Sequence, residues 1–176
     1  MNSPSAAMWM LYSAPPMPNI TTFLTFNNQA EEAARFYTSI FPNSRITHIT
    51  HFPDLGPQAP FKAGGVMTVS FVLDGREFVA LNGGPQFAFS QAMSISVVCE
   101  TQDEVDRYWE HLTSGGGQGV ACGWLTDKFG VSWQINPKIL MELIGHRDQA
   151  KAKNAMQAMM TMVKIDGEQL KRAVAQ

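Results

Sequence analysis

The stretch from Cys122 to Pro137 reads CGWLTDKFGVSWQINP and predicts a strand, a tight turn and a second strand. Asp127 and Gly130 bracket the reversal, because an aspartate side chain can hydrogen-bond to a turn and glycine accepts positive φ. After the turn, apolar residues alternate with polar ones as far as Asn136. A period of two is typical of a strand with one face in a core and the other on something polar. We interpret the rest of the chain as the walls around that polar face.

The composition limits the classes of function. The chain has 176 residues, of which 45% are hydrophobic and 16% charged, with a net charge of −2. Such a chain forms one domain or two small similar halves. Without a Lys/Arg cluster, nucleic acid and anionic membrane are poor partners, and no apolar run is long enough to span a bilayer. Residues 1–17 predict an N-terminal tail without the features of a signal peptide, so we expect a cytoplasmic protein with two free cysteines.

The predicted elements occur in the same order twice. The first half begins with a strand at 20–26, a helix capped by Asn27-Asn28 and a strand at 45–52. Two further strands follow at 66–73 and 77–82, on either side of the hairpin signal Asp74-Gly75. The second half has strand 93–99, a helix with a capping box at Thr101 and Glu104, and strands 119–125 and 131–136. Three further helices are predicted over 137–144, over 148–162 and after Asp166, packed on the domain or on a second subunit.

Several motifs resemble a known superfamily. Phe36-Tyr37 and the pattern Asp127-x-Phe-Gly-x-x-Trp-Gln are similar to the vicinal-oxygen-chelate superfamily, that of glyoxalase I and bleomycin-resistance proteins. More narrowly, the chain resembles the PhnB-like family, often labelled "3-demethylubiquinone-9 3-methyltransferase", over residues 18–176. The segments that carry this resemblance are Ala30-Glu31-Glu32-Ala33, Leu81-Asn82-Gly83-Gly84-Pro85, Cys122-Gly123-Trp124-Leu125, Ser132-Trp133-Gln134 and Ala155-Met156 with Ala158-Met159-Met160.

The resemblance implies an α+β fold of two βαβββ modules, whose curved sheets form a cup. It places a glyoxalase-like domain at 18–147, with modules at 18–85 and 86–137, followed by a helical extension at 148–176. It also implies a homodimer.

The same resemblance allows a test for a metal site. In metal-using relatives, His or Glu ligands come from the first and last strands of each module. The corresponding positions here are Thr21 or Thr22, Asn82, Ser94 or Ser96, and Gln134. Hydroxyls and amides make a poor divalent site, so we expect neither a metal nor a cofactor, although Gln134 could hold a metal weakly. His48 and His51 are three apart on a strand and point to opposite faces unless the strand bulges.

The hypothesis for function is therefore a metal-free cup that binds a small molecule. Its expected ligand-binding residues are Thr22, Asn82, Phe87, Phe89, Ser94, Ser96, Ser132 and Gln134. Two alternatives stay open here: the polar positions could form a solvated sheet face, and the two phenylalanines could fill the core. Catalytic residues are not identified, and Cys122 is interpreted as a structural thiol because no His or Lys is near it in sequence to lower its pKa.

The alternative function is a superfamily enzyme of the lyase, isomerase or dioxygenase type that uses a weakly held divalent metal. Methyl transfer is not expected, because it normally uses a doubly wound sheet with a Gly-rich first turn. The Gly115-Gly116-Gly117 run follows a predicted helix instead of opening one.

Overall fold

Two βαβββ modules make up most of the computed structural model, which describes residues 20–175. The predicted tail at 1–17 lies outside the described residues. The first module contains β1 (Thr22–Phe26), α1 (Ala30–Ile40), β2 (Arg45–His51), β3 (Val66–Leu73) and β4 (Arg76–Asn82). The second contains β5 (Ile95–Cys99), α2 (Gln102–Thr113), a 3₁₀ turn (Ser114–Gly116), β6 (Gln118–Gly119), β7 (Trp124–Thr126) and β8 (Ser132–Pro137). The α+β class and the repeated module are thus confirmed.

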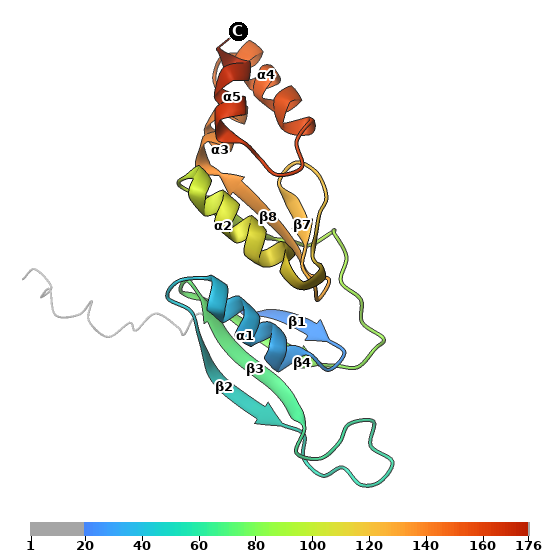
Figure 1. Ribbon diagram of the computed structural model, residues 1–176. Helices are drawn as coiled ribbons and strands as arrows, with labels where there is room; N and C mark the ends of the chain where they lie inside the picture. The colour runs from blue at the N-terminus through green and yellow to red at the C-terminus, as the bar shows by residue number, and fades with distance from the viewer. Residues whose placement is uncertain (1–19, 176) are drawn as a thin grey trace, which may run out of the picture.

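Each module has its own four-stranded sheet, in the order β1-β4-β3-β2 and β5-β8-β7-β6. In both, the first strand pairs in parallel with the last strand of the module, and the other pairs are antiparallel. Helices α1 and α2 lie on the same side of the two sheets, and the segment between β4 and β5 runs along the outside from one module to the other (Figure 1). Strands β1 and β5 are therefore both edge strands, and between residues 20 and 175 no ladder joins the two sheets.

Two turns behave as predicted and one strand does not. Asp74 and Gly75 both have positive φ, as the two-residue hairpin between β3 and β4 requires. The turn after β7 closes with a hydrogen bond from Gly130 N–H to the Asp127 carbonyl at 3.0 Å. The single strand predicted over 119–125 is wrong: Cys122 and Gly123 also have positive φ, and this kink separates β6 from β7.

The helix caps also show one difference from prediction. The Thr101 hydroxyl accepts from the Glu104 N–H, as expected for the start of α2. Helix α1 is capped neither by Asn27 nor by Asn28, since its cap residue Gln29 makes no side-chain bond. Instead the Asn82 Oδ1 atom, at the end of β4, accepts from the Ala30 N–H at 2.9 Å.

The C-terminal helices α3 (Lys138–Ile144), α4 (Gln149–Met160) and α5 (Gly167–Val174) pack around a second apolar cluster. They attach to the second module through backbone bonds from Cys122 N–H to Met162 and from Gly123 N–H to Val163, both 2.8 Å. Figure 1 shows them at the end of that module away from the first. Within residues 20–175, no helix combines the length and the hydrophobicity needed to cross a membrane.

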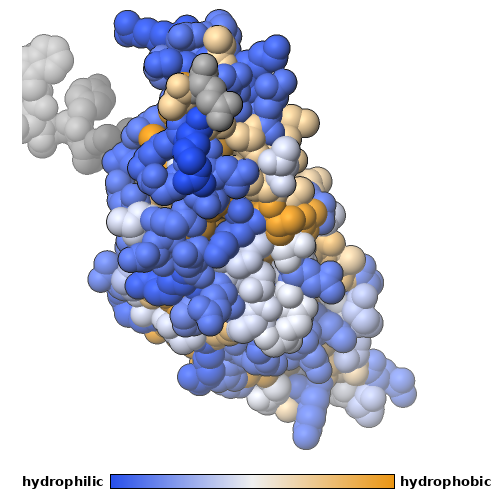
Figure 2. Space-filling view, turned by 45° about the horizontal axis from the view of Figure 1, so that its top comes forward, coloured by the Kyte–Doolittle hydropathy of each residue, from blue (hydrophilic) through white to orange (hydrophobic). Residues whose placement is uncertain are grey.

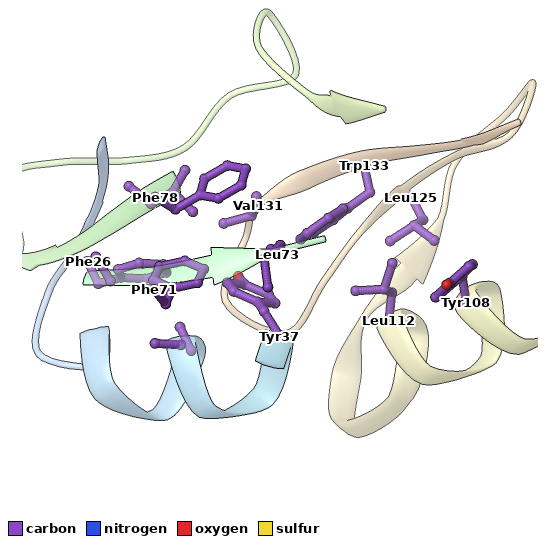
Figure 3. Packing of buried hydrophobic residues seen from close by; sticks show 14 of the residues in the cluster. Phe26, Tyr37, Phe71, Leu73, Phe78, Tyr108, Leu112, Leu125, Val131 and Trp133 are labelled. Atoms are coloured by element: carbon purple, nitrogen blue, oxygen red, sulfur yellow. The ribbon is translucent and has the colours of Figure 1, made fainter. Parts of the chain in front are cut away.

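The main core is continuous across both modules. Phe71, Tyr37, Trp133 and Leu125 follow one another along a single apolar layer between the strands and the two helices (Figure 3). The outer face drawn in Figure 2 is largely hydrophilic, with apolar residues gathered toward one side. The two modules therefore behave as one packing unit, although their sheets stay separate.

Asp127 links the modules within this core. It is 3% exposed, and its Oδ1 atom accepts from the N–H groups of Phe129 and Val131. Its Oδ2 atom accepts from the Tyr37 hydroxyl of α1 at 2.8 Å and from the Trp133 indole of β8 at 2.9 Å. Burial raises the pKa of the Asp127 carboxyl, and these four donors oppose the rise. Burial also raises the pKa of Tyr37, and the neighbouring carboxylate raises it further.

Replacing Tyr37 by phenylalanine should lower the free energy of unfolding by about 1–2 kcal/mol, because a buried carboxylate oxygen loses one of its donors. Urea unfolding of the wild type and Tyr37→Phe measures this difference. The matched control is Tyr108→Phe, since Tyr108 is also buried but makes no hydroxyl hydrogen bond within the described residues. Equal losses in the two variants would show that the bond to Asp127 does not stabilise the junction.

Candidate functional site

The two faces of the sheets differ in chemistry. On the face that α1 and α2 cover, buried apolar residues such as Phe71, Trp133 and Ile135 alternate along the strands. On the opposite face, the second module presents mostly polar side chains. These are Ser94, Ser96, Ser132, Gln134 and Asn136.

A cavity of about 270 Å³ opens where the first strands of the two modules approach each other. Its walls come from β1, from residues 87–93 between the modules, and from the starts of β5 and β8. We call it the seam cavity. The aromatic and thioether residues that line it are Phe23, Phe87, Phe89 and Met93, and the hydroxyl residues are Thr25, Ser90, Ser94 and Ser132. Leu24, Ala88, Ile95 and Val131 complete the lining.

Four of the expected ligand-binding residues meet at the seam cavity. Phe87, Phe89, Ser94 and Ser132 all contribute to its lining. Sequence reasoning missed Phe23 and Thr25, because it chose the other face of β1. The exposed fraction of Phe23 is 57%, a signal that appears only when the strand is placed against its neighbours.

Ser132 has an unusual environment. It is 2% exposed, and its Oγ atom is the one buried side-chain oxygen or nitrogen among the described residues that lacks a hydrogen-bond partner. Leaving a buried hydroxyl unpaired costs about 1–3 kcal/mol, so such groups are rare without a reason. A bound molecule in the cavity that Ser132 lines would supply the missing partner.

The phenylalanines hold two different positions. Phe89 packs edge-on against Phe26 of the core, with ring centroids 5.2 Å apart. Phe87 is 55% exposed at the cavity rim. A Cβ atom at Gly83 would lie 2.5 Å from the Thr25 methyl group and 3.1 Å from the Phe87 ring, so glycine allows these two walls to come together. Phe89 thus both fills the core and lines the cavity.

Gln134 and Ser96 lie on the same sheet face but not in the cavity lining. The Gln134 Nε2 atom donates to the Ser94 Oγ atom at 2.8 Å, and Asn136 donates to Ser96 at 3.4 Å. Gln134 therefore contacts the cavity only through Ser94. This indirect position is not evident from the strand pattern.

Thr22 and Asn82 lie apart from this group. Thr22 begins β1 and does not line the seam cavity, and Asn82 faces α1, where it caps the helix and donates to the Val66 carbonyl. Asn82 does line a second, larger hollow of about 770 Å³ at the far end of the first module, near Phe61 and Lys62. The Asn82 amide is already satisfied there, so we place the candidate site at the seam cavity.

Side chains that could bind a metal, and charged side chains, do not gather at the seam cavity in the described part of the chain. Among the described residues, no three His, Cys, Asp or Glu side chains come close enough to hold a metal together. His48 and His51 are exposed on the edge strand β2, next to bulges in its pairing with β3. The described residues that line the seam cavity all have neutral side chains.

Comparison with known proteins gives one family and several solved structures. The family described as 3-demethylubiquinone-9 3-methyltransferase matches residues 18–136. The PhnB protein from Bacillus cereus is 39% identical over 68% of this chain and 99% of its own, with a TM-score of 0.60. A Pseudomonas aeruginosa protein is 24% identical over 68% of this chain and 97% of its own, with a TM-score of 0.53.

A Staphylococcus aureus protein is 33% identical over 66% of this chain and 93% of its own, with a TM-score of 0.30. No protein with a curated description matches. The family match ends at residue 136, before α3 begins at Lys138.

The two cysteines lie outside the cavity lining and are both free. Cys99 is fully buried at the end of β5. Burial, together with the nearby Glu104 carboxylate, raises the pKa of the Cys99 thiol to about 12, although Arg107 opposes the rise. Cys122 is partly exposed in the turn before β7. The two thiols should therefore differ in reactivity, because the thiolate is the reacting form.

In the native protein at neutral pH, iodoacetamide should alkylate Cys122 while Cys99 stays unmodified. Peptide mass spectrometry after timed quenching measures both rates. In a denaturing concentration of urea, both cysteines should react at similar rates, which serves as the control. Alkylation of native Cys99 as fast as Cys122 would contradict the burial of β5 under α2.

Proposed function

The chain belongs to the 3-demethylubiquinone-9 3-methyltransferase family, and we propose that it binds a small molecule in the seam cavity without the help of a metal ion. The unpartnered Ser132 hydroxyl is the observation that carries this proposal. Ser132 is one of the residues that line the seam cavity, whose walls are mostly apolar and whose few polar groups are hydroxyls, the usual composition of a small-molecule site.

The chemistry of the lining favours binding over catalysis. General acid–base chemistry needs a group with a pKa near the working pH, and nucleophilic chemistry needs an activated side chain. The described residues around the seam cavity supply serine and threonine hydroxyls, and the one amide that reaches them is Gln134. A divalent cation would find no carboxylate or imidazole among these groups.

Methyl transfer, which the family description names, does not fit the fold around this cavity. The methyl donor S-adenosylmethionine is normally held by a doubly wound parallel sheet with a Gly-rich turn after its first strand. Here the turn after β1 reads Asn27-Asn28-Gln29, and each sheet contains one parallel pair of strands. We therefore derive no step through that cofactor.

We further propose a homodimer that acts in the cytoplasm. Two unpaired cysteines fit a reducing compartment. The C-terminal helices and the loop between α4 and α5 carry exposed apolar side chains suited to a contact between subunits, namely Met141, Met156, Met160 and Val163.

A fragment library that includes neutral, anionic and cationic compounds tests the binding site by ligand-observed NMR. We expect hits that compete with one another and that disappear in Ala88→Trp, since Ala88 is an exposed residue of the cavity lining and a tryptophan there would occupy the opening. The control is Ala92→Trp, an exposed position on the same segment outside the lining.

Elemental analysis of the same dialysed samples tests the absence of a metal. We expect binding to persist without stoichiometric Zn, Fe, Mn or Ni. Hits that survive in Ala88→Trp, or that require a metal which resists dialysis, would overturn the proposal and favour the enzyme alternative.

A further inference from the structure

We infer that the ligand of the seam cavity is a neutral aromatic molecule, about one substituted ring in size, that carries a hydrogen-bond acceptor. This inference rests on the proposed function, because it concerns the same cavity. Four observations support it: the volume, the absence of charge, the kind of apolar wall, and the direction in which the polar groups can bond.

The volume sets the size of the ligand. The seam cavity measures about 270 Å³. Sites for drug-sized ligands are about 300–1,000 Å³, whereas an apolar cavity of about 150 Å³ already holds benzene. One substituted ring fits between these limits.

The lining sets the charge. Each described residue around the cavity is neutral, and the side chains in closest contact with it are aromatic, aliphatic or hydroxyl groups. A charged ligand would lose its hydration without gaining an opposite charge, which is strongly unfavourable. The nearby cation Lys128 does not change this, because its ammonium group pairs with Glu32 at 2.8 Å and lies over the rings of Phe36 and Phe129.

The walls favour an aromatic ring. Phe23 and Phe87 are more than half exposed at the rim, and Met93 is 64% exposed beside them. Phe89 is fixed from behind by Phe26. Aromatic side chains and the polarisable methionine sulfur pack favourably against a bound ring, and this contact would cover the apolar surface that the empty rim exposes.

The hydroxyls favour an acceptor on that ring. The Ser94 Oγ atom accepts a hydrogen bond from the Gln134 amide, so its own O–H remains free to donate. The Ser132 Oγ atom has no partner and is buried, so it can also donate to a ligand once its side chain rotates toward the cavity that the residue lines. A carbonyl or ether oxygen on the ligand can accept a hydrogen bond from each of these two hydroxyls, since both residues line the same cavity.

Four ring compounds of similar size separate these features: acetophenone, toluene, benzoate and benzylammonium. Dissociation constants come from NMR titration at pH 7 with wild type, Ser132→Ala and a control, Ser39→Ala, whose hydroxyl lies on the exposed side of α1. Acetophenone should bind wild type at least about tenfold more tightly than benzoate or benzylammonium, since neither charge is paired in the cavity.

Ser132→Ala should weaken acetophenone about five- to tenfold, the value of one hydrogen bond, and leave toluene unchanged within about twofold. Equal or tighter binding of either charged compound overturns the inference on charge, while the proposed function stands. An unchanged acetophenone affinity in Ser132→Ala overturns the acceptor contact. If none of the four binds but the broad library yields hits lost in Ala88→Trp, the ligand class is wrong; if the library also fails, both proposals fall.

Discussion

A buried carboxylate at the turn between β7 and β8 determines how the two modules meet. Removing Asp127 from water is costly, and four donors offset that cost: two backbone N–H groups of its own turn, one indole of β8 and one hydroxyl of α1. Only the Tyr37 hydroxyl comes from the first module. The same side chain therefore shapes the local turn and fixes the position of α1 relative to the second sheet. If the turn or α1 were displaced, the buried carboxylate would lose hydrogen-bond donors.

The hydrogen bond between Tyr37 and Asp127 lies on the face of the sheets that the helices cover. It does not involve the edge strands β1 and β5. Strands β1 and β5 form no ladder with each other within the described residues, and the packing of Tyr37, Phe41 and Trp133 holds the modules together instead. Side chains and the segment between the modules close the remaining gap, which becomes the seam cavity. The cavity is thus a consequence of joining two sheets through their helices instead of their edges.

Local patterns in the sequence were sufficient for most of the fold, and four of the residues expected to bind a ligand line the seam cavity. The alternation through Trp133 predicted which face of β8 packs into the apolar core, and Asp74-Gly75 predicted a hairpin, because both depend on neighbours in the chain. Asn82 could not be placed in this way, since its partner Ala30 lies on another element and only tertiary packing brings the two together. Thr22 illustrates a second limit: a shift of one residue along a strand exchanges its faces, so Phe23 and Thr25 line the cavity instead.

Gln134 shows how a residue outside the cavity can still define its chemistry. The resemblance to metal-using relatives marks this position as one that carries a carboxylate, and an amide there removes the strongest ligand. The structure adds a second effect, because the amide is also a donor: it donates a hydrogen bond to the Ser94 oxygen and leaves the serine O–H free to donate into the cavity. A carboxylate at this position would instead accept a hydrogen bond from the Ser94 hydroxyl, and that O–H would then not be available to a ligand. The exchange of one functional group therefore disfavours a metal and, at the same time, presents a neutral donor to a bound molecule.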